Sequence, residues 1–184
     1  MNRYKPRLTL KQLIEHMKYA KLERQLKPLC RWVNFYDYIW SYDLINWNNK
    51  TVVDIGADIG SSAMFFLMHG ASYVYLIEKK PEYKKIYRRL KQQYPILKNT
   101  EMLQSIKDIP EGHFNVLKMD CEGCEQRLLT EDLLKRAYEF VIGLHKPPLD
   151  DYQFEVKKRL LEKYRGKYFG SVNNVEHMWM KVFD

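Results

Sequence analysis

The sequence lacks the long apolar runs and the paired cysteines that mark membrane and secreted proteins. None of its apolar runs reaches the roughly 18 residues that a helix needs to cross a bilayer. The first seven residues are basic, but no apolar stretch follows them as it would in a secretory signal. Cysteine occurs at three positions, an odd number that argues against a secreted disulfide framework. We therefore expect an intracellular, cytoplasmic protein without a membrane span.

The chain also lacks internal repeats and low-complexity segments. Its 184 residues are enough for one domain with its own hydrophobic core and too few for two full catalytic domains. Hydrophobic residues make up 46% of the sequence, which excludes a disordered chain because such chains cannot offset their ordering entropy. We expect a globular protein, and nothing in the pattern specifies its oligomeric state.

The positive charge is unevenly distributed. The formal net charge is +8, and residues 1–31 contain nine basic side chains against Glu15 and Glu23. One interpretation is an anionic partner, either nucleic acid or a phosphorylated substrate, because such a segment concentrates anions. The other is a solvated surface rich in Lys and Glu, of the kind found in heat-adapted proteins. The composition alone leaves both open.

An N-terminal helical segment precedes an alternation of strands and helices. A capping box at Thr9 and apolar residues at helical spacing predict a helix over residues 10–27, and the aromatic segment 32–40 should pack on the main domain. The predicted strands cover residues 51–55, 73–78, 101–103, 114–120, 138–144, 167–172 and 176–183, and the predicted helices cover 61–69, 81–94, 125–136 and 151–165. Asn173-Asn174 suggests a hairpin between the last two strands. We predict an α/β fold with a doubly wound, mostly parallel sheet, an N-terminal cap at 1–47 and the main domain at 48–184.

A glycine-containing loop follows the first predicted strand. Residues 54–60 read Asp-Ile-Gly-Ala-Asp-Ile-Gly and lead into a helix, at the place where doubly wound sheets bind nucleotides. Glycine lets a ligand approach the backbone closely, and Glu78, at the end of the second strand, can accept hydrogen bonds from ribose hydroxyls. Such a loop alone is weak evidence, but its position between strand and helix strengthens it.

The charges of the loop distinguish between cofactors. A dinucleotide site has a glycine where this loop has Asp58, and a carboxylate there would repel pyrophosphate. S-adenosylmethionine has no phosphate and carries a sulfonium and an ammonium, so Asp54 and Asp58 would attract it. The alternative is that Asp58 only caps the next helix. The candidate cofactor-binding residues are Asp54, Gly56, Ala57, Asp58, Gly60, Glu78, Lys79 and Asp120.

An acidic cluster follows the strand predicted at residues 114–120. Asp120 ends this strand, and with Glu122 and Glu125 it could orient a nucleophile, act as a base or hold a divalent cation. Glu125 could instead be an ordinary first-turn helix residue. His145 follows the fifth strand and could face the same cleft, although a lone histidine in a loop is more often structural.

Cys121 and Cys124 have a spacing that occurs in redox and zinc sites. A structural zinc needs four ligands, usually from two such pairs, and the sequence has no second pair. We therefore predict no metal site from the thiols, while a labile disulfide between them stays open.

The two motifs together resemble the FkbM-type class I methyltransferases. Those enzymes pair Asp-x-Gly-Ala-Asn-x-Gly with Lys-x-Asp-x-Glu-Gly-x-Glu, which matches residues 54–60 and 118–125 here, and the resemblance extends over about residues 51–148. It implies a seven-stranded sheet, S-adenosylmethionine as cofactor and, commonly, methylation of a hydroxyl oxygen. Two departures are Asp58 in place of Asn, and Gly143 in place of a Glu two residues before the histidine.

The sequence therefore predicts methyl transfer to a hydroxyl oxygen of a small molecule or glycan. Asp120 would orient the acceptor, with Glu122 beside it, and His145 would be the base because an ordinary histidine pKa of about 6.5 suits that role. One alternative is a nucleic-acid methyltransferase that uses residues 1–31, although the Asn/Asp-Pro-Pro-aromatic motif of exocyclic-amine enzymes does not occur. Another is a catalytically inactive module that only binds the cofactor.

Overall fold

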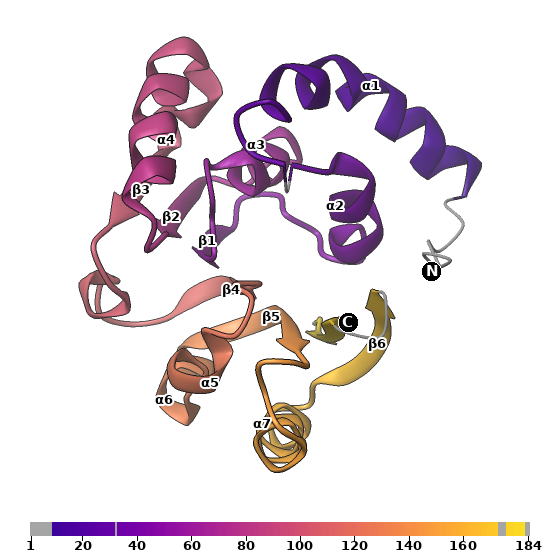
Figure 1. The fold of residues 1–184 in the computed structure, drawn as a ribbon, viewed down its shortest axis with the longest axis vertical. Coiled ribbons are helices and arrows are strands. Elements are labelled where there is room, and N and C mark those ends of the chain that lie inside the picture. Colours follow the sequence, from indigo (N-terminus) through magenta and orange to yellow (C-terminus); the bar gives the residue numbers. More distant parts are fainter. Residues whose placement is uncertain (1–8, 32, 173–175, 183–184) are drawn as a thin grey trace.

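The alternating strands form one seven-stranded sheet between two layers of helices (Figure 1). The computed structural model describes residues 9–31, 33–172 and 176–182. The strands are β1 (Thr51–Ile55), β2 (Tyr73–Ile77), β3 (Thr100–Leu103), β4 (Phe114–Met119), β5 (Ala137–His145), β6 (Lys167–Val172) and β7 (Glu176–Lys181). Their order in the sheet is β3-β2-β1-β4-β5-β7-β6.

The sheet is parallel from β3 to β5, and β7 runs antiparallel between β5 and β6. This confirms the predicted doubly wound, mostly parallel seven-stranded sheet with an antiparallel strand. The turn expected at Asn173-Asn174 lies outside the described residues.

Seven α-helices are present in the described ranges of the chain. They are α1 (Leu10–Leu26), α2 (Phe35–Tyr42), α3 (Ser61–Met68), α4 (Pro81–Gln93), α5 (Glu125–Leu128), α6 (Glu131–Arg136) and α7 (Asp151–Lys163), and the short 3-10 helices η1 (Pro95–Asn99) and η2 (Ile106–Asp108) flank β3. The capping box expected at Thr9 is present, since the Thr9 hydroxyl accepts the backbone N–H of Gln12 at 3.3 Å.

The single helix predicted over residues 125–136 is wrong. The helix is interrupted at residues 129 and 130. The Thr130 hydroxyl accepts the backbone N–H of Leu133 at 3.2 Å, which starts a new helix. A capping hydroxyl satisfies one of the N–H groups that a helix start leaves unpaired, which makes a second start at Thr130 favourable.

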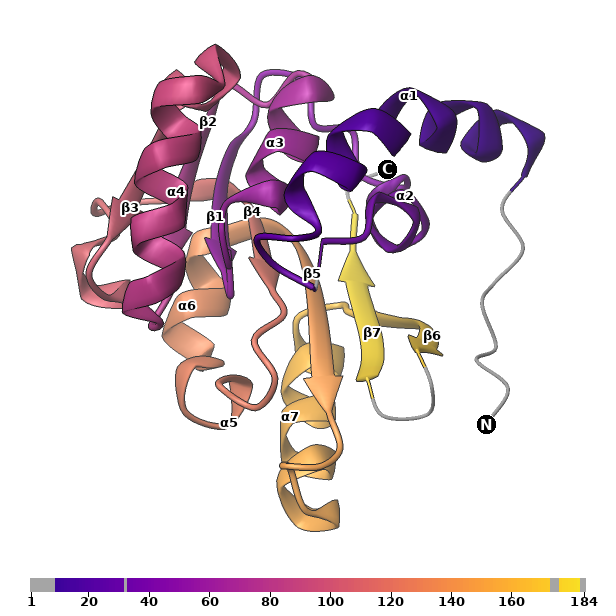
Figure 2. The same ribbon diagram turned by 45° about the horizontal axis from the view of Figure 1, so that its top comes forward.

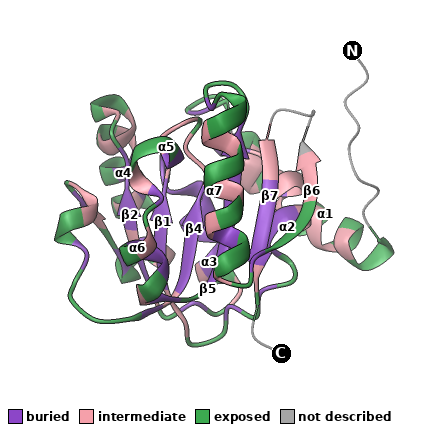
Figure 3. Ribbon diagram, turned by 90° about the horizontal axis from the view of Figure 1, so that it is seen from below, coloured by how far each residue is buried: buried purple, intermediate pink, exposed green. Residues whose placement is uncertain are grey.

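The two faces of the sheet carry separate hydrophobic clusters. Successive residues of a strand point to opposite faces, so Val52 packs in the cluster under α1 to α4 and Val53 in the cluster under α5 to α7. Figure 3 shows the central strands buried and the outer sides of α4 and α7 exposed. This arrangement explains why β1, β4 and β5 are buried along nearly their whole length.

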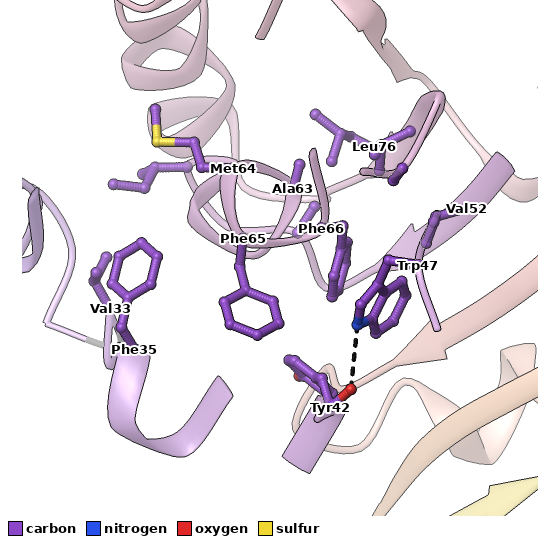
Figure 4. Close-up of a cluster of buried hydrophobic side chains, with 14 of the residues drawn as sticks. Val33, Phe35, Tyr42, Trp47, Val52, Ala63, Met64, Phe65, Phe66 and Leu76 are labelled. Carbon is purple, nitrogen blue, oxygen red and sulfur yellow. Dashed lines mark hydrogen bonds between the residues drawn. The ribbon is translucent and has the colours of Figure 1, made fainter. Parts of the chain in front are cut away.

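The N-terminal segment joins the first of these clusters through aromatic contacts (Figure 4). Trp47 stacks on Phe66 of α3 with ring centroids 4.3 Å apart, and its indole N–H donates to the carbonyl of Tyr42 at 3.2 Å. Phe35 of α2 is fully buried beside Phe65. The prediction that the aromatic segment packs on the main domain is confirmed. Figure 2 shows that the first turns of α1, in contrast, extend beyond the sheet.

Candidate active site

A cavity of about 860 Å³ opens at the carboxyl edge of the sheet. Residues of the glycine loop and of the ends of β2, β4 and β5 line it, as do residues of the N-terminal segment and the first residue of β7. In open α/β sheets this edge is where ligands bind. The cavity therefore lies where the sequence predicts the site, and of the predicted residues Gly56, Asp58, Glu78, Lys79, Asp120, Glu122 and His145 line it.

Gly56 allows the loop to pass directly against the end of β4. Its φ is +80°, and a β-carbon at this position would lie 1.9 Å from the carbonyl oxygen of Asp120. Backbone atoms cannot yield to such a contact, so glycine is required here for both conformation and space. The close approach brings the loop and Asp120 to the same cavity wall.

Glu78 is held rigidly at the cavity wall. The residue is 5% exposed, and its two carboxylate oxygens accept the backbone N–H groups of Asp58 at 3.0 Å and Lys80 at 2.8 Å. Each carboxylate oxygen has a second acceptor position. Glu78 can therefore accept hydrogen bonds from a ligand without losing those that fix it.

Asp58 presents a second carboxylate to the cavity. It has a left-handed backbone, with φ of +48°. Burial raises the pKa of Asp58 to about 6, because the attraction of Lys118 offsets only part of the desolvation and Glu78 adds repulsion. A half-buried carboxylate of this kind gains from a cationic ligand, which would replace interactions with water that it has lost.

Asp54 lies beneath the loop and does not line the cavity. It is fully buried, accepts the Ser62 hydroxyl at 2.5 Å and pairs with Lys118 at 2.9 Å. The ammonium of Lys118 also donates to the carbonyl of Gly56 at 2.9 Å. Asp54 therefore supports the loop through Lys118 and Ser62. Ala57 and Gly60 do not line the cavity either, and their contribution would come from the backbone.

Glu125 is the buried partner of His145, a relationship that the sequence analysis did not find. Glu125 is the first residue of α5, which agrees with the alternative that it is a first-turn helix residue. Its Oε1 also accepts two hydrogen bonds from His145, from Nδ1–H at 2.7 Å and from the backbone N–H at 2.8 Å. Its other oxygen accepts the backbone N–H of Gly123 at 2.9 Å. Linear sequence gives no signal for this pair, because it forms only when β4 and β5 lie side by side.

His145 turns its other nitrogen toward Asp120, with Nε2 3.5 Å from Oδ1 of the carboxylate. Burial lowers the pKa of His145, but the hydrogen bond with Glu125 and the nearby carboxylates outweigh it and raise the pKa to about 9. The imidazole therefore carries a proton at neutral pH. The assumption of an ordinary histidine pKa, on which its role as a base was predicted, is wrong.

Glu176 brings a carboxylate from β7 that no sequence motif indicates. It pairs with His145 across the antiparallel β5–β7 ladder, and the ligating atoms of Asp120, His145 and Glu176 all lie within 4.8 Å of one another. Burial and the charge of Asp120 raise the pKa of Glu176. A β-carbon on Gly143 would lie 2.6 Å from Oε1 of Glu176, so this carboxylate occupies the space that a side chain at 143 would need.

Glu122 and the two cysteines of this segment lie outside the buried group around His145. Glu122 is exposed at the cavity rim and has φ of +50°. Cys121 and Cys124 form a disulfide with their α-carbons 5.4 Å apart, the arrangement that the sequence left open. A pair of oxidised sulfurs has no thiolate to offer a zinc ion.

The N-terminal segment closes one side of the cavity. Tyr38 and Tyr42 of α2 line it together with Lys27 and Arg31. The Tyr38 hydroxyl also forms a hydrogen bond of 2.8 Å with that of Ser61 at the start of α3. None of the helices in the described residues has the length and apolar character needed to cross a membrane.

Two viral proteins are similar to the chain in sequence. Uncharacterized protein 65 of Sulfolobus islandicus filamentous virus is 33% identical over 109 residues, which are 59% of this chain and 68% of that protein. Uncharacterized protein 158B of Sulfolobus islandicus rod-shaped virus 1 is 31% identical over 117 residues, or 63% of this chain and 72% of that protein. No family model matches the chain.

The fold is similar to solved methyltransferases. An O-methyltransferase from Bacillus cereus in complex with SAH has a TM-score of 0.63 at 12% identity, covering 94% of this chain and 90% of that one. Magnesium protoporphyrin IX methyltransferase from Synechocystis with bound SAM has a TM-score of 0.58 at 12% identity, covering 95% and 97%. A SAM-dependent methyltransferase from Aquifex aeolicus has a TM-score of 0.55 at 17% identity, covering 89% and 97%. The chain therefore has the fold of class I SAM-dependent methyltransferases.

Proposed function

The chain belongs to the family of these two viral proteins, and we propose that it is an S-adenosylmethionine-dependent methyltransferase that acts on a hydroxyl oxygen of a small molecule or glycan. The observation that carries this proposal is the placement of Gly56, Asp58 and Glu78 on the wall of one cavity with Asp120. The FkbM-type motifs within residues 51–148 support oxygen as the target.

The residues of the cavity fit this cofactor better than a dinucleotide. Glu78, fixed by two backbone amides, suits the two hydroxyls of a ribose. Asp58 is a half-buried carboxylate whose pKa is raised by desolvation and by the neighbouring carboxylates, so it suits an ammonium or sulfonium and opposes a pyrophosphate. When bound, the cofactor supplies an electrophilic methyl group on its sulfonium.

Asp120 is the residue that we assign to the acceptor. Its carboxylate lies at the cavity wall and can accept the hydrogen bond of an acceptor hydroxyl, which orients the oxygen. His145, protonated and fixed by Glu125, holds Asp120 from the other side. Transfer forms the oxygen–methyl bond and breaks the sulfur–methyl bond, and the Asp120 carboxylate, which accepts the hydrogen bond of the hydroxyl, takes its proton and releases it to solvent.

The N-terminal cap at residues 1–47 is assigned to acceptor contacts. The half-buried Tyr38, stacked on the buried Tyr42, offers aromatic surface with a polar tip, and Lys27 and Arg31 add positive charge at the cavity. Glu122, at the rim, would contact the acceptor as well. Such a wall suits a polar small molecule or a glycan.

A nucleic-acid acceptor is the second candidate, because α1 presents exposed cations. Lys11, Lys18 and Lys21 are all exposed on this helix. Phosphate contacts make binding strongly dependent on salt, with affinity falling about 10³-fold or more between 50 and 200 mM for six or more contacts. A small-molecule acceptor would show only a weak dependence.

The proposed activity can be tested with a radiolabelled methyl donor and a fractionated cell extract. We expect label to enter a fraction that resists both nuclease and protease, with a rate that changes little between 50 and 200 mM salt. Label lost on nuclease treatment would establish the second candidate instead. Cofactor binding with no labelled product in any fraction would favour an inactive cofactor-binding module.

A further inference from the structure

We propose that Asp120, His145 and Glu176 form a binding site for one divalent cation of the Mn²⁺ class on the wall of the cavity. The existence of this site does not depend on the proposed function, but the role assigned to the ion below rests on it. The three residues come from the end of β4, the end of β5 and the start of β7. They are far apart in sequence, and only the sheet brings them together.

The separations fit a single ion. The ligand atoms of the three side chains lie within 4.8 Å of one another. Bonds of about 2.1 Å place two donor atoms on the same ion about 3 to 4 Å apart. Small side-chain rotations would therefore bring all three donors onto one cation.

The hydrogen bonding of His145 matches that of a metal ligand. Its Nδ1–H donates to the buried carboxylate of Glu125 at 2.7 Å, which leaves Nε2 as the nitrogen directed at Asp120. Histidines that bind metals almost always donate their other ring N–H to a carboxylate or carbonyl, which fixes the ring and its tautomer. The carboxylate of Glu176 lies within 4.8 Å of the same group, so the fixed ring faces two acidic side chains on its Nε2 side.

Gly143 makes the third ligand possible. A β-carbon at this position would lie 2.6 Å from Oε1 and 3.1 Å from Cγ of Glu176. The absence of a side chain lets the Glu176 carboxylate lie beside His145, its ladder partner. The position therefore controls the site without supplying a ligand.

The set of donors indicates the kind of ion. Two carboxylates and one imidazole leave open positions for water or substrate and suit Mn²⁺ better than the soft ions that thiolates prefer. Glu125 is excluded as a ligand because its Oε1 already accepts two hydrogen bonds from His145. Glu122 is exposed and lies outside the group of three. The group of Cys121, Cys124 and Glu125 also lies close together, but its sulfurs are joined in a disulfide.

An ion at this place would act on the acceptor oxygen. A divalent cation polarises a bound hydroxyl and lowers its pKa, so that the proton leaves to solvent as the oxygen–methyl bond forms and the sulfur–methyl bond breaks. Binding the ion at Nε2 would displace the proton that this nitrogen carries in the metal-free protein, so His145 would serve as a ligand and the ion would activate the acceptor hydroxyl.

The test is Mn²⁺ binding by the full chain with its disulfide intact. Binding is measured as the loss of the electron paramagnetic resonance signal of free Mn²⁺. We expect one ion per chain, and at least tenfold weaker affinity in Glu176→Gln and in Asp120→Asn. Gly143→Ala should also weaken binding several-fold, because it displaces the Glu176 carboxylate. Glu122→Gln, a nearby carboxylate outside the site, is the matched control and should keep the affinity of the unmodified chain. Circular dichroism establishes that each variant is folded.

The outcomes separate this inference from the proposed function when SAH affinity is measured in the same samples. SAH binding without Mn²⁺ binding, or Mn²⁺ binding that Glu176→Gln and Asp120→Asn leave unchanged, overturns the metal site and leaves the methyltransferase proposal standing. Mn²⁺ binding that depends on Glu176 and Asp120 without SAH binding supports the site and overturns the proposed function.

Discussion

Glu125 accepts two hydrogen bonds from one residue, the Nδ1–H and the backbone N–H of His145, with the same carboxylate oxygen. The side chain of Glu125 is fully buried and that of His145 is 9% exposed. The pair therefore joins α5 to the end of β5 beneath the cavity and fixes the orientation of the imidazole.

Loss of the Glu125 charge should destabilise the protein. In Glu125→Ala the buried imidazolium loses its counter-charge, and breaking a buried pair in this way costs about 3 to 5 kcal/mol. Urea denaturation measures the free energy of unfolding. The exposed Glu122→Ala is the matched control and should change it by no more than about 0.5 kcal/mol. Equal effects of the two changes would contradict the role given to Glu125.

The buried pair of Lys118 and Asp54 should behave as a unit. Lys118→Met leaves the Asp54 carboxylate buried without its cation, so the free energy of unfolding should fall by about 3 to 5 kcal/mol. The double change Asp54→Asn with Lys118→Met should recover part of that loss, because no buried charge is left unpaired. A double-mutant cycle in denaturant measures the coupling. Additive losses would show that the two side chains do not depend on each other.

Cofactor affinity should fall in mildly acidic solution because of Asp58. The folded protein raises the pKa of Asp58 to about 6, so its carboxylate is largely charged at pH 7 and largely neutral at pH 5. The binding constant for SAH should therefore weaken about tenfold between those values, since the charged fraction changes by about that factor. Isothermal titration calorimetry at several pH values measures this. Asp58→Asn should bind more weakly and lose the dependence, and a dependence unchanged in that variant would assign it to another group.

The N-terminal cap should unfold together with the sheet. Trp47 is 2% exposed and stacked on Phe66, so Trp47→Ala should lower the free energy of unfolding by about 3 to 5 kcal/mol. The transition should stay single when followed both by far-ultraviolet circular dichroism and by hydrogen exchange of α1 and α2. Two separate transitions would show that residues 1–47 fold independently. Leu13 on α1 is 44% exposed, so Leu13→Ala should have little effect on the free energy of unfolding.

The order of strands and helices could be predicted from the sequence because each element has a strong local pattern. The β-branched run of β1 and the glycines of the loop after it identify a nucleotide-binding edge, and the capping box at Thr9 marks the start of α1. The division between α5 and α6 escaped prediction, because Thr130 can act either as a helix interior residue or as a cap.

The carboxylates around His145 could not be predicted, because contacts between distant elements place them there. Glu125 looks like a first-turn helix residue, and Glu176 looks like a strand residue near the end of the chain. Their meeting depends on the register of β5 with β7 and on the missing side chain of Gly143. The raised pKa of His145 follows from the same contacts, which is why a reference value misled the prediction of its role.

The most direct test of the account is isothermal titration calorimetry of the purified chain with S-adenosylmethionine, SAH and NAD. We predict micromolar affinity for the first two, roughly −8 kcal/mol, and none for NAD. Glu78→Ala and Gly56→Val should weaken both, the first by removing the ribose acceptor and the second by forcing the loop away from Asp120. Tight binding of NAD with no heat from the other two ligands would contradict the methyltransferase account.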